Sequence, residues 1–239
     1  MRTGRRLWLG VAAIALCFAP CALGQSQVNI SLTSAGNNVM DGVYVGPYSA
    51  TVNGTPTQII CDDFTDETYV GESWTANVTT LSNLNGTKWG GMANATTLYD
   101  EAAWLATQML SPTYSGNPTQ VGYLAYALWA VFAPSAVESW LGANSAAWQA
   151  VQGWLNTAAA QHFTPNEFAN FFIYTPNLSF PITCNGQSCA NTPPQEFFGF
   201  LSAADGGSTL LYLLLVTMVC AGAIWLRSRR PVEVPVTVV

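Results

Sequence analysis

Two apolar segments bordered by arginines frame this chain, one at each end. Three arginines within the first six residues precede an apolar run over residues 7–19, which is shorter than a membrane span. Residues 209–226 carry no charge, and Arg227, Arg229 and Arg230 follow them directly. A helix of that length would extend about 27 Å, close to the ~30 Å thickness of a hydrocarbon core. The pattern predicts an N-terminal signal peptide and one C-terminal transmembrane helix.

Between these ends, the polar and apolar positions change their period twice. Residues 28–81 are rich in β-formers interrupted by turn residues, residues 97–172 follow a helical period, and β-character returns over residues 171–201. This order predicts an α+β fold, in which an antiparallel sheet carries a helical insertion of three to four helices. Small residues ahead of the body predict signal cleavage between Gly24 and Gln25. The predicted parts are a signal peptide (1–24), a secreted ectodomain (25–202) and a C-terminal sorting or anchor segment (203–239).

Individual elements follow from the same periods. Asn53-Gly54 between two β-runs predicts a tight hairpin. Thr97 followed by Asp100 has the spacing of a capping box and predicts the start of the first helix, and Thr164-Pro165 predicts the start of a short fourth one. The predicted strands are 43–45, 49–52, 58–61, 74–81, 171–174, 180–182 and 197–200, and helical stripes run over 98–109, 121–132 and 148–155.

Charge is distributed very unevenly along the chain. Every basic residue except Lys88 lies in one of the two end segments, so residues 25–204 hold eleven acidic residues against one basic residue, a formal charge of −10. Such a body repels phosphate backbones, which excludes nucleic acid as a partner. The few charges and the many Asn, Thr, Ser and Gly residues are typical of a secreted bacterial surface protein.

Three cysteines, Cys61, Cys184 and Cys189, fall within the ectodomain. An Asn-Gly turn signal lies between Cys184 and Cys189, so a tight hairpin would bring the two sulfur atoms together. We predict a Cys184–Cys189 disulfide, with a pairing to Cys61 as the alternative. The spacing of Cys184 and Cys189 matches half of a zinc site. The chain has a single histidine and no second ligand pair, so no cofactor is predicted.

An acidic cluster beside a predicted strand is the candidate for a metal site. Asp62, Asp63 and Asp66 supply hard oxygen ligands of the kind that Ca²⁺ prefers. The alternation of acidic residues found in Ca²⁺-binding loops is missing here, so a solvated acidic edge is the favoured interpretation.

The sequence predicts no catalytic activity. Nucleophilic chemistry needs a base, and the one histidine, His162, lies at a predicted helix end. Asp100 and Glu101 could form a glycosidase pair, but adjacent residues on a helix point about 100° apart. The tryptophans of the helical stripes are expected to pack in the core rather than stack on sugars: Trp104, Trp129, Trp148 and Trp154.

A short motif precedes the C-terminal apolar run, and the arginine cluster closes it. The motif residues are Asp205, Gly206, Gly207, Ser208 and Thr209. This three-part layout resembles the PEP-CTERM class of bacterial sorting signals, in the variant whose motif reads Val-Pro-Asp-Gly-Gly. Alanines stand at the positions of Val and Pro, and the tail after the arginines is longer than usual for that class.

The resemblance implies that an exosortase, a membrane-embedded cysteine transpeptidase, is the partner of this segment. The arginines would hold the C-terminal end inside, and the glycines would present an accessible peptide bond at the membrane face. Cutting there would release the body or transfer it to a surface acceptor. Without cutting, the same helix is a plain membrane anchor. Proteins of this class are often associated with exopolysaccharide, which adds a second candidate partner.

Two further motifs lie in the ectodomain. Ile60-Cys61-Asp62-Asp63 ends a β-region, and Ala127-Leu128-Trp129 follows in a helix. The pair resembles the thioester domains of bacterial surface adhesins, which join a cysteine to the glutamine of a Thr-Gln-x-Ala-x-Trp motif. Leu124 and Ala125 occupy the Thr and Gln positions here, and Ala125 has no carboxamide carbon for a thiol to attack. The resemblance therefore implies a related fold without the covalent bond, in which Cys61 is a buried, inert thiol.

These observations together predict an exported bacterial surface or extracellular-matrix protein without catalytic activity, sorted by an exosortase. The alternative is a permanently anchored single-pass membrane protein whose ectodomain is adhesive or binds carbohydrate.

Overall fold

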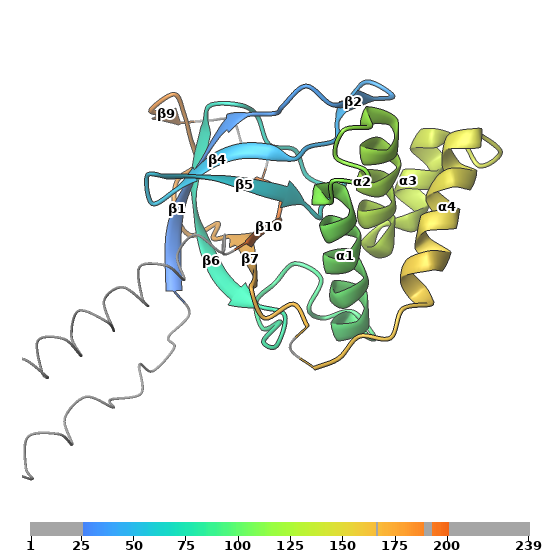
Figure 1. Cartoon of the computed structure of the whole chain (residues 1–239). Coiled ribbons are helices and arrows are strands. Elements are labelled where there is room, and N and C mark those ends of the chain that lie inside the picture. The colour runs from blue at the N-terminus through green and yellow to red at the C-terminus, as the bar shows by residue number, and fades with distance from the viewer. Residues whose placement is uncertain (1–25, 166, 189–192, 201–239) are drawn as a thin grey trace, which may run out of the picture.

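The computed structural model describes residues 26–165, 167–188 and 193–200. Figure 1 shows a coiled antiparallel sheet on one side and a group of four helices on the other, within these residues. The predicted α+β class is therefore confirmed. The predicted signal peptide and the predicted membrane helix lie outside the described residues, and no helix inside them is long and apolar enough to cross a membrane.

The sheet closes on itself into a barrel. Its first strand, β1, pairs on one side with β4 and on the other with β6, and the circuit runs β1-β4-β5-β10-β7-β6 and back to β1 through antiparallel pairings. Closure leaves no unpaired edge within the circuit. The strands are β1 (Ser26–Ser34), β4 (Tyr48–Val52), β5 (Thr55–Cys61), β6 (Glu72–Thr80), β7 (Phe171–Pro176) and β10 (Phe197–Phe200).

Two short hairpins accompany the barrel. β8 (Thr183–Cys184) and β9 (Gln187–Ser188) extend the sheet from β6, whereas β2 (Val39–Met40) and β3 (Val43–Tyr44) form a separate ribbon. Gly122 on α2 lies close against Met40 of this ribbon. The ribbon therefore lies over the helical layer.

Local sequence accounts for most of the strands. In β6, the buried Trp74 and Ala76 alternate with half-exposed hydroxyl residues, which is the period of a strand with one side on the core. Asn53 and Gly54 have φ values of 49° and 81°, as a type I′ turn requires, and they connect β4 to β5. The predicted hairpin is confirmed.

Four helices form the second layer, with α2 between its neighbours. Asn117 accepts a hydrogen bond from the backbone N–H of Gln120, and Pro118 occupies the first position of α2. Ser145 caps α4 in the same way through the N–H of Trp148. The helices are α1 (Ala95–Leu110), α2 (Pro118–Phe132), α3 (Pro134–Leu141) and α4 (Ala146–Ala159).

The predicted boundaries were wrong at both ends of the helical region. α1 begins at Ala95, after Asn94 in a left-handed conformation (φ 62°) without a side-chain cap, so Thr97 lies inside the helix and forms no capping box. The described residues after Thr164 form a turn rather than a fourth helix. There the carboxylate of Glu167 accepts from the N–H and the hydroxyl of Thr164 at 3.0 and 3.2 Å.

Two further elements differ from prediction. α3 was not predicted, because Val137 is its one buried residue and a single apolar position gives no helical stripe. The strand predicted at 180–182 is not formed, and β8 begins instead at Thr183 beside Ser73 of β6. Tertiary pairing rather than local β-propensity sets that boundary.

One hydrophobic core joins the barrel and the helices. Its largest fully buried side chains come from both layers, such as Phe197 on β10 and Trp129 on α2. Trp129 and Trp148 are buried, which confirms the predicted use of these tryptophans. Trp104 and Trp154 are half-buried and pack against each other with their ring centroids 6.3 Å apart.

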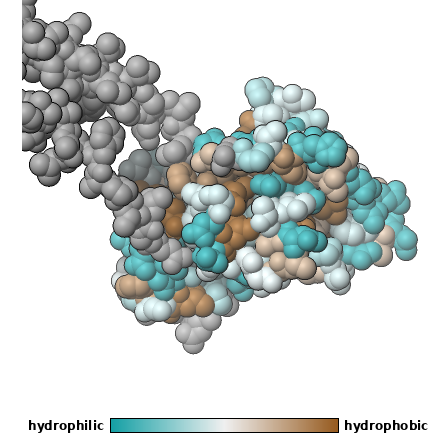
Figure 2. Space-filling view, turned by 90° about the horizontal axis from the view of Figure 1, so that it is seen from below, coloured by the Kyte–Doolittle hydropathy of each residue, from teal (hydrophilic) through white to brown (hydrophobic). Residues whose placement is uncertain are grey.

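The surface mixes polar and apolar residues. On the face drawn in Figure 2, hydrophobic residues lie between patches of hydrophilic ones and do not form one continuous apolar surface. Among the tryptophans of the described residues, Trp140 on α3 is the most exposed, at 55%.

Candidate functional site

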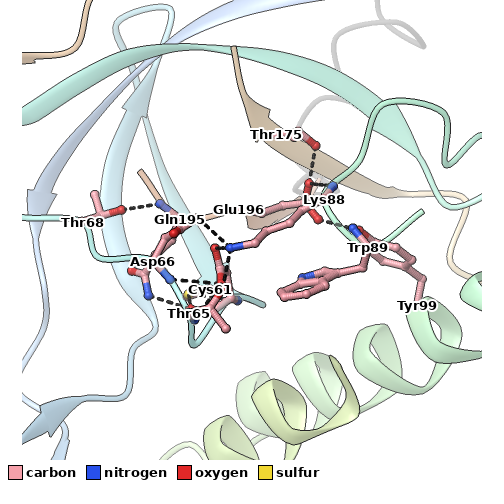
Figure 3. Close-up of polar contacts among 11 residues, drawn as sticks. Cys61, Thr65, Asp66, Thr68, Lys88, Trp89, Tyr99, Thr175, Gln195 and Glu196 are labelled. Carbon is pink, nitrogen blue, oxygen red and sulfur yellow. Dashed lines mark hydrogen bonds and ion pairs between the residues drawn. The ribbon is translucent and has the colours of Figure 1, made fainter. Parts of the chain in front are cut away.

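Buried polar residues gather where the barrel meets the helices. Asp62 and Asp63 directly follow β5 and are completely buried, and Glu196 directly precedes β10 and is buried as well. Lys88 comes from the loop between β6 and α1, and Figure 3 shows it together with Asp66 and Glu196. We call Asp62, Asp63, Asp66, Lys88 and Glu196 the junction cluster.

Asp63 organises the loop that follows β5. Its Oδ1 accepts hydrogen bonds from the N–H and the hydroxyl of Thr65, both at 2.8 Å, and from the N–H of Asp66 at 3.3 Å. An aspartate carboxylate that accepts from the backbone N–H groups two and three residues later stabilises a local turn. Gln195 adds a cross-link, because its side-chain amide donates to the Asp63 carbonyl at 2.6 Å.

The ammonium group of Lys88 lies between two carboxylates. Its Nζ is 2.5 Å from Oδ2 of Asp63 and 2.6 Å from Oδ2 of Asp66, and it also donates to the hydroxyl of Thr65 at 2.7 Å. Burial lowers the pKa of Lys88, but its hydrogen bonds to Asp63 and Asp66 outweigh burial and leave the pKa above its ordinary value. The Trp89 ring, whose centroid is 4.9 Å from Nζ, covers the cation.

Glu196 receives donors from three separate parts of the chain. The hydroxyl of Tyr99 on α1 donates to Oε1 at 2.5 Å, and the backbone N–H of Lys88 donates to Oε2 at 2.8 Å. The hydroxyl of Thr175 on β7 also donates to Oε2. A buried carboxylate is tolerated when donors satisfy it in this way.

Asp62 has a very different environment. Its carboxyl group lies against that of Glu196, yet no donor among the described residues reaches either of its oxygens when both groups are ionised. Burial, then the charges of Glu196 and Asp63, raise the pKa of Asp62 well above its usual range. Burial also raises the pKa of Glu196, although its donors oppose that shift. The donors around Glu196 favour its charged form, whereas the surroundings of Asp62 favour its neutral form.

Cys61 sits at the centre of this junction as a free, buried thiol. Its Sγ donates to the carbonyl of Asp63 at 3.0 Å, and its own carbonyl accepts from Nε1 of Trp129 at 2.9 Å. Burial, then the charges of Asp63 and Asp62, raise the pKa of the thiol well above its usual range. Because the thiolate is the reactive form, this environment disfavours nucleophilic chemistry.

The fold brings the strand motif that ends in Asp63 into contact with the helical motif that ends in Trp129. Trp129, the tryptophan of the helical motif, hydrogen-bonds the backbone of Cys61 in the strand motif. Ala125 is buried on α2, and a methyl side chain offers no carboxamide carbon to the thiol. The described geometry contains no partner for a thioester.

The interpretation of the acidic residues as a solvated edge was wrong for the buried members. Asp62 and Asp63 are fully buried, and the Ca²⁺ candidates Asp63 and Asp66 share the ammonium group of Lys88. No group of three or more Asp, Glu, His or Cys side chains in the described part of the chain is arranged to hold a metal ion. A cation of the chain itself neutralises these carboxylates.

Asp100 and Glu101, the adjacent acids that were not expected to act as a glycosidase pair, both lie on α1. Asp100 on α1 opens onto a pocket of about 420 Å³ that Thr164 and Glu167 also line, and Glu101 is not among the described lining residues. Burial, then the charge of Glu167, raise the pKa of Asp100 above its usual value, and burial raises that of Glu101.

The structure describes only one of the two cysteines of the predicted disulfide. Cys184 lies on β8, and Asn185 and Gly186 have φ values of 50° and 81°, so the turn signal does form a tight hairpin. Cys61 is free, which removes the alternative pairing. Cys189 lies outside the described residues, so the Cys184–Cys189 bond stays a prediction.

The remaining predicted sites lie outside the described residues. They are the cleavage site at Gly24 and Gln25, the sorting motif Asp205, Gly206, Gly207, Ser208 and Thr209, and the arginines Arg227, Arg229 and Arg230.

Sequence reasoning missed two of the five residues of the junction cluster, Lys88 and Glu196. Lys88 and Glu196 lie 108 residues apart, and no local pattern connects them. Two signals were present, because Lys88 is the single base of the body and Glu196 is the single acid between Glu167 and Asp205. An isolated charge in a chain with few charges indicates a specific partner, but it does not identify that partner.

Comparisons with known proteins add no assignment. No protein-family model, curated protein or solved structure matches the chain.

Proposed function

We propose that this protein is an exported bacterial surface or extracellular-matrix protein without catalytic activity. A signal peptide directs export, and an exosortase acts on the sorting motif ahead of the C-terminal helix. Charge supports this proposal, because the body carries −10 and the compensating arginines are confined to the two end segments.

The observation that carries the proposal is the position of the two ends of the folded body. Ser26 of β1 pairs with Val78 near the end of β6, and Phe200 of β10 pairs with Phe171 at the start of β7. The last residue of β6 pairs with the second residue of β7, so all four strand ends meet at one end of the barrel. The first and last described residues of the body therefore lie at the same end of the barrel, so both end segments continue from one side of it.

The buried junction cluster supports a non-catalytic role. Asp62, Asp63 and Glu196 have no exposed surface, and Cys61 is 1% exposed. A catalytic group must reach its substrate within hydrogen-bond distance. The most perturbed groups of the described chain instead hold the two layers together.

The intact mass of the mature protein from its native host, with both termini sequenced, tests the proposal. We expect an N-terminus at Gln25 and a C-terminus between Asp205 and Ser208, or an added mass at that position. A mature chain that still ends at Val239 would sink the exosortase assignment and leave a permanently anchored protein.

A matched pair of variants separates processing from general proteolysis. Gly207→Pro stiffens the backbone at the expected cut and should block it while the apolar helix is retained. Thr237→Ala in the tail changes a residue outside the motif and should be processed normally. Equal processing of both variants would contradict cutting at the motif.

An adhesive or carbohydrate-binding ectodomain is the alternative, and Trp140 is the observation that favours it. Its ring is 55% exposed and contacts Phe64 edge-on, with centroids 6.1 Å apart. We expect Trp140→Ala to abolish co-sedimentation with polysaccharide from the host if the alternative holds. Wild-type protein that stays in the supernatant would exclude it.

A further inference from the structure

The junction cluster contains a position where only a proton can compensate the charge. Glu196 already accepts from Tyr99, Thr175 and the backbone of Lys88. Asp62 faces it without a donor on either oxygen among the described residues. With both carboxyl groups ionised, an uncompensated charge would lie in a fully buried site beside another negative charge.

No other charged group at the junction can take over this role. The ammonium group of Lys88 is engaged by Asp63 and Asp66, on the other side of the cluster. The remaining titratable groups facing Asp62 are the thiol of Cys61 and the phenol of Tyr99, and their ionisation would only add negative charge.

The pair also sits where separate elements meet. Asp62 directly follows β5 and Glu196 directly precedes β10, whereas Tyr99 belongs to α1 and Thr175 to β7. The backbone N–H of Asp62 donates to the carbonyl of Glu196 at a long 3.3 Å, so the strand pairing is already weak there. Repulsion between the two side chains would separate the helical layer from this end of the barrel.

We propose that one proton shared by Asp62 and Glu196 is a latch between the barrel and the helices, and that its loss as the pH rises opens this seam. The latch differs from the proposed surface role, because it describes how the body responds to pH wherever the protein is located. Opening would expose the loop that carries Lys88 and the first turn of α1, while the rest of the barrel stays paired.

The sign of the effect follows from linkage. An aspartate whose pKa is raised on folding stabilises the protein below its unfolded pKa of about 3.9, and this stabilisation is lost as the pH rises through the folded pKa. Between these two values, one released proton raises the opening constant about tenfold per pH unit. A lower pH therefore closes the latch, and a higher pH opens it.

Hydrogen exchange on the full-length protein measures the opening directly. We expect the protection factors of residues 88–99 and 196–200 to fall with rising pH, after correction for intrinsic exchange, while those of β1 and β4 stay constant. The side chain of Asp62→Asn is neutral at every pH and can still donate to Glu196. The logarithm of the protection factor should therefore fall with pH less steeply in this variant than in the wild type, by about one unit per pH unit. Glu138→Gln on α3 removes an acid outside the junction cluster and should behave as the wild type. Parallel profiles for Asp62→Asn and the wild type would overturn the proposal.

A second measurement does not depend on the folding of a variant. Infrared spectroscopy of the wild-type protein in D₂O should show the carbonyl band of a protonated carboxylic acid at pH values above the ordinary aspartate pKa of about 3.9, and the band should disappear over the pH range in which protection is lost. A folded protein that loses this band at the pH of an ordinary aspartate would overturn the latch as well.

Discussion

At the scale of single residues, the surroundings of each charge decide what it does. Lys88 is the only lysine or arginine of the body. Its side chain forms ion pairs with two carboxylates at the junction instead of lying free on the acidic surface. Asp62 and Asp63 are neighbours in sequence, yet one faces another acid and the other a lysine. Composition alone therefore says little about the ionisation of any one group.

Removing the lysine should destabilise the fold. Loss of one partner from a buried pair costs about 3–5 kcal/mol, and we expect about 2 kcal/mol for Lys88→Met because the Lys88 side chain keeps 24% of its surface exposed. Chemical denaturation measures the change in the free energy of unfolding. Lys88→Arg keeps the charge and should lose less than Lys88→Met. Equal losses would show that packing of the side chain, rather than its charge, is what matters.

The thiol of Cys61 should resist alkylation. It is buried, and its raised pKa keeps it protonated at neutral pH. We expect iodoacetamide to leave the peptide containing Cys61 unmodified in the folded protein and to modify it after unfolding in guanidinium chloride. Peptide mass spectrometry reads out the result. Labelling of the folded protein at the rate of a free thiol would contradict the structure.

At the scale of elements, local pattern predicted well where it was strong. β10 occupies the residues that its aromatic run predicts, and α1, α2 and α4 match the three apolar stripes within a few residues. α3 escaped prediction because it buries one residue, and the strand expected at 180–182 was displaced by pairing with β6. Both errors occur where tertiary contacts, and not local periodicity, define the element.

The short strand β10 depends on a glycine. A Cβ at Gly199 would lie 2.2 Å from Cε2 of Tyr174, whereas nothing lies within 4 Å of a Cβ at Gly153 on α4. We expect Gly199→Ala to destabilise the protein by about 1–3 kcal/mol. Gly153→Ala should stabilise it by about 0.5–1 kcal/mol, because alanine is the better helix former. Thermal unfolding of the two variants measures both effects, and shifts of the same sign would contradict this account.

At the scale of the whole molecule, the body carries an excess of negative charge. Eleven acidic residues against one basic residue repel one another in the compact state more than in the unfolded chain. We expect the free energy of unfolding to increase by on the order of 1 kcal/mol between about 0.01 M and about 1 M NaCl, because salt screens that repulsion. Chemical denaturation with urea, which adds no ions, measures the change.

A variant with fewer surface acids provides the control. Asp41→Asn, Glu67→Gln and Glu138→Gln together remove three negative charges outside the buried pair and should flatten the salt dependence. An unchanged dependence would mean that salt acts on the apolar surface instead of on the charges.

The sequence by itself determined the properties that depend on neighbours along the chain. These are the apolar end segments with their arginines, the acidic body, the α+β order of the elements and the Asn-Gly turns. Each of these properties follows from the spacing of apolar residues or from the number of charged residues, and both can be read along the chain without knowing which distant segments meet. The proposal of export and sorting joins these features to the position of the two ends of the folded body.

Only the tertiary structure decided the closure of the barrel and the junction cluster. Closure requires β1 to pair with β6, and the cluster requires Glu196 to meet Lys88, 108 residues away. Neither contact produces a local pattern in the sequence, because both join residues that are far apart along the chain. The donors that satisfy a buried polar group are brought to it only by folding. The shared proton of Asp62 and Glu196 is therefore a property of the folded molecule, and no stretch of its sequence carries it alone.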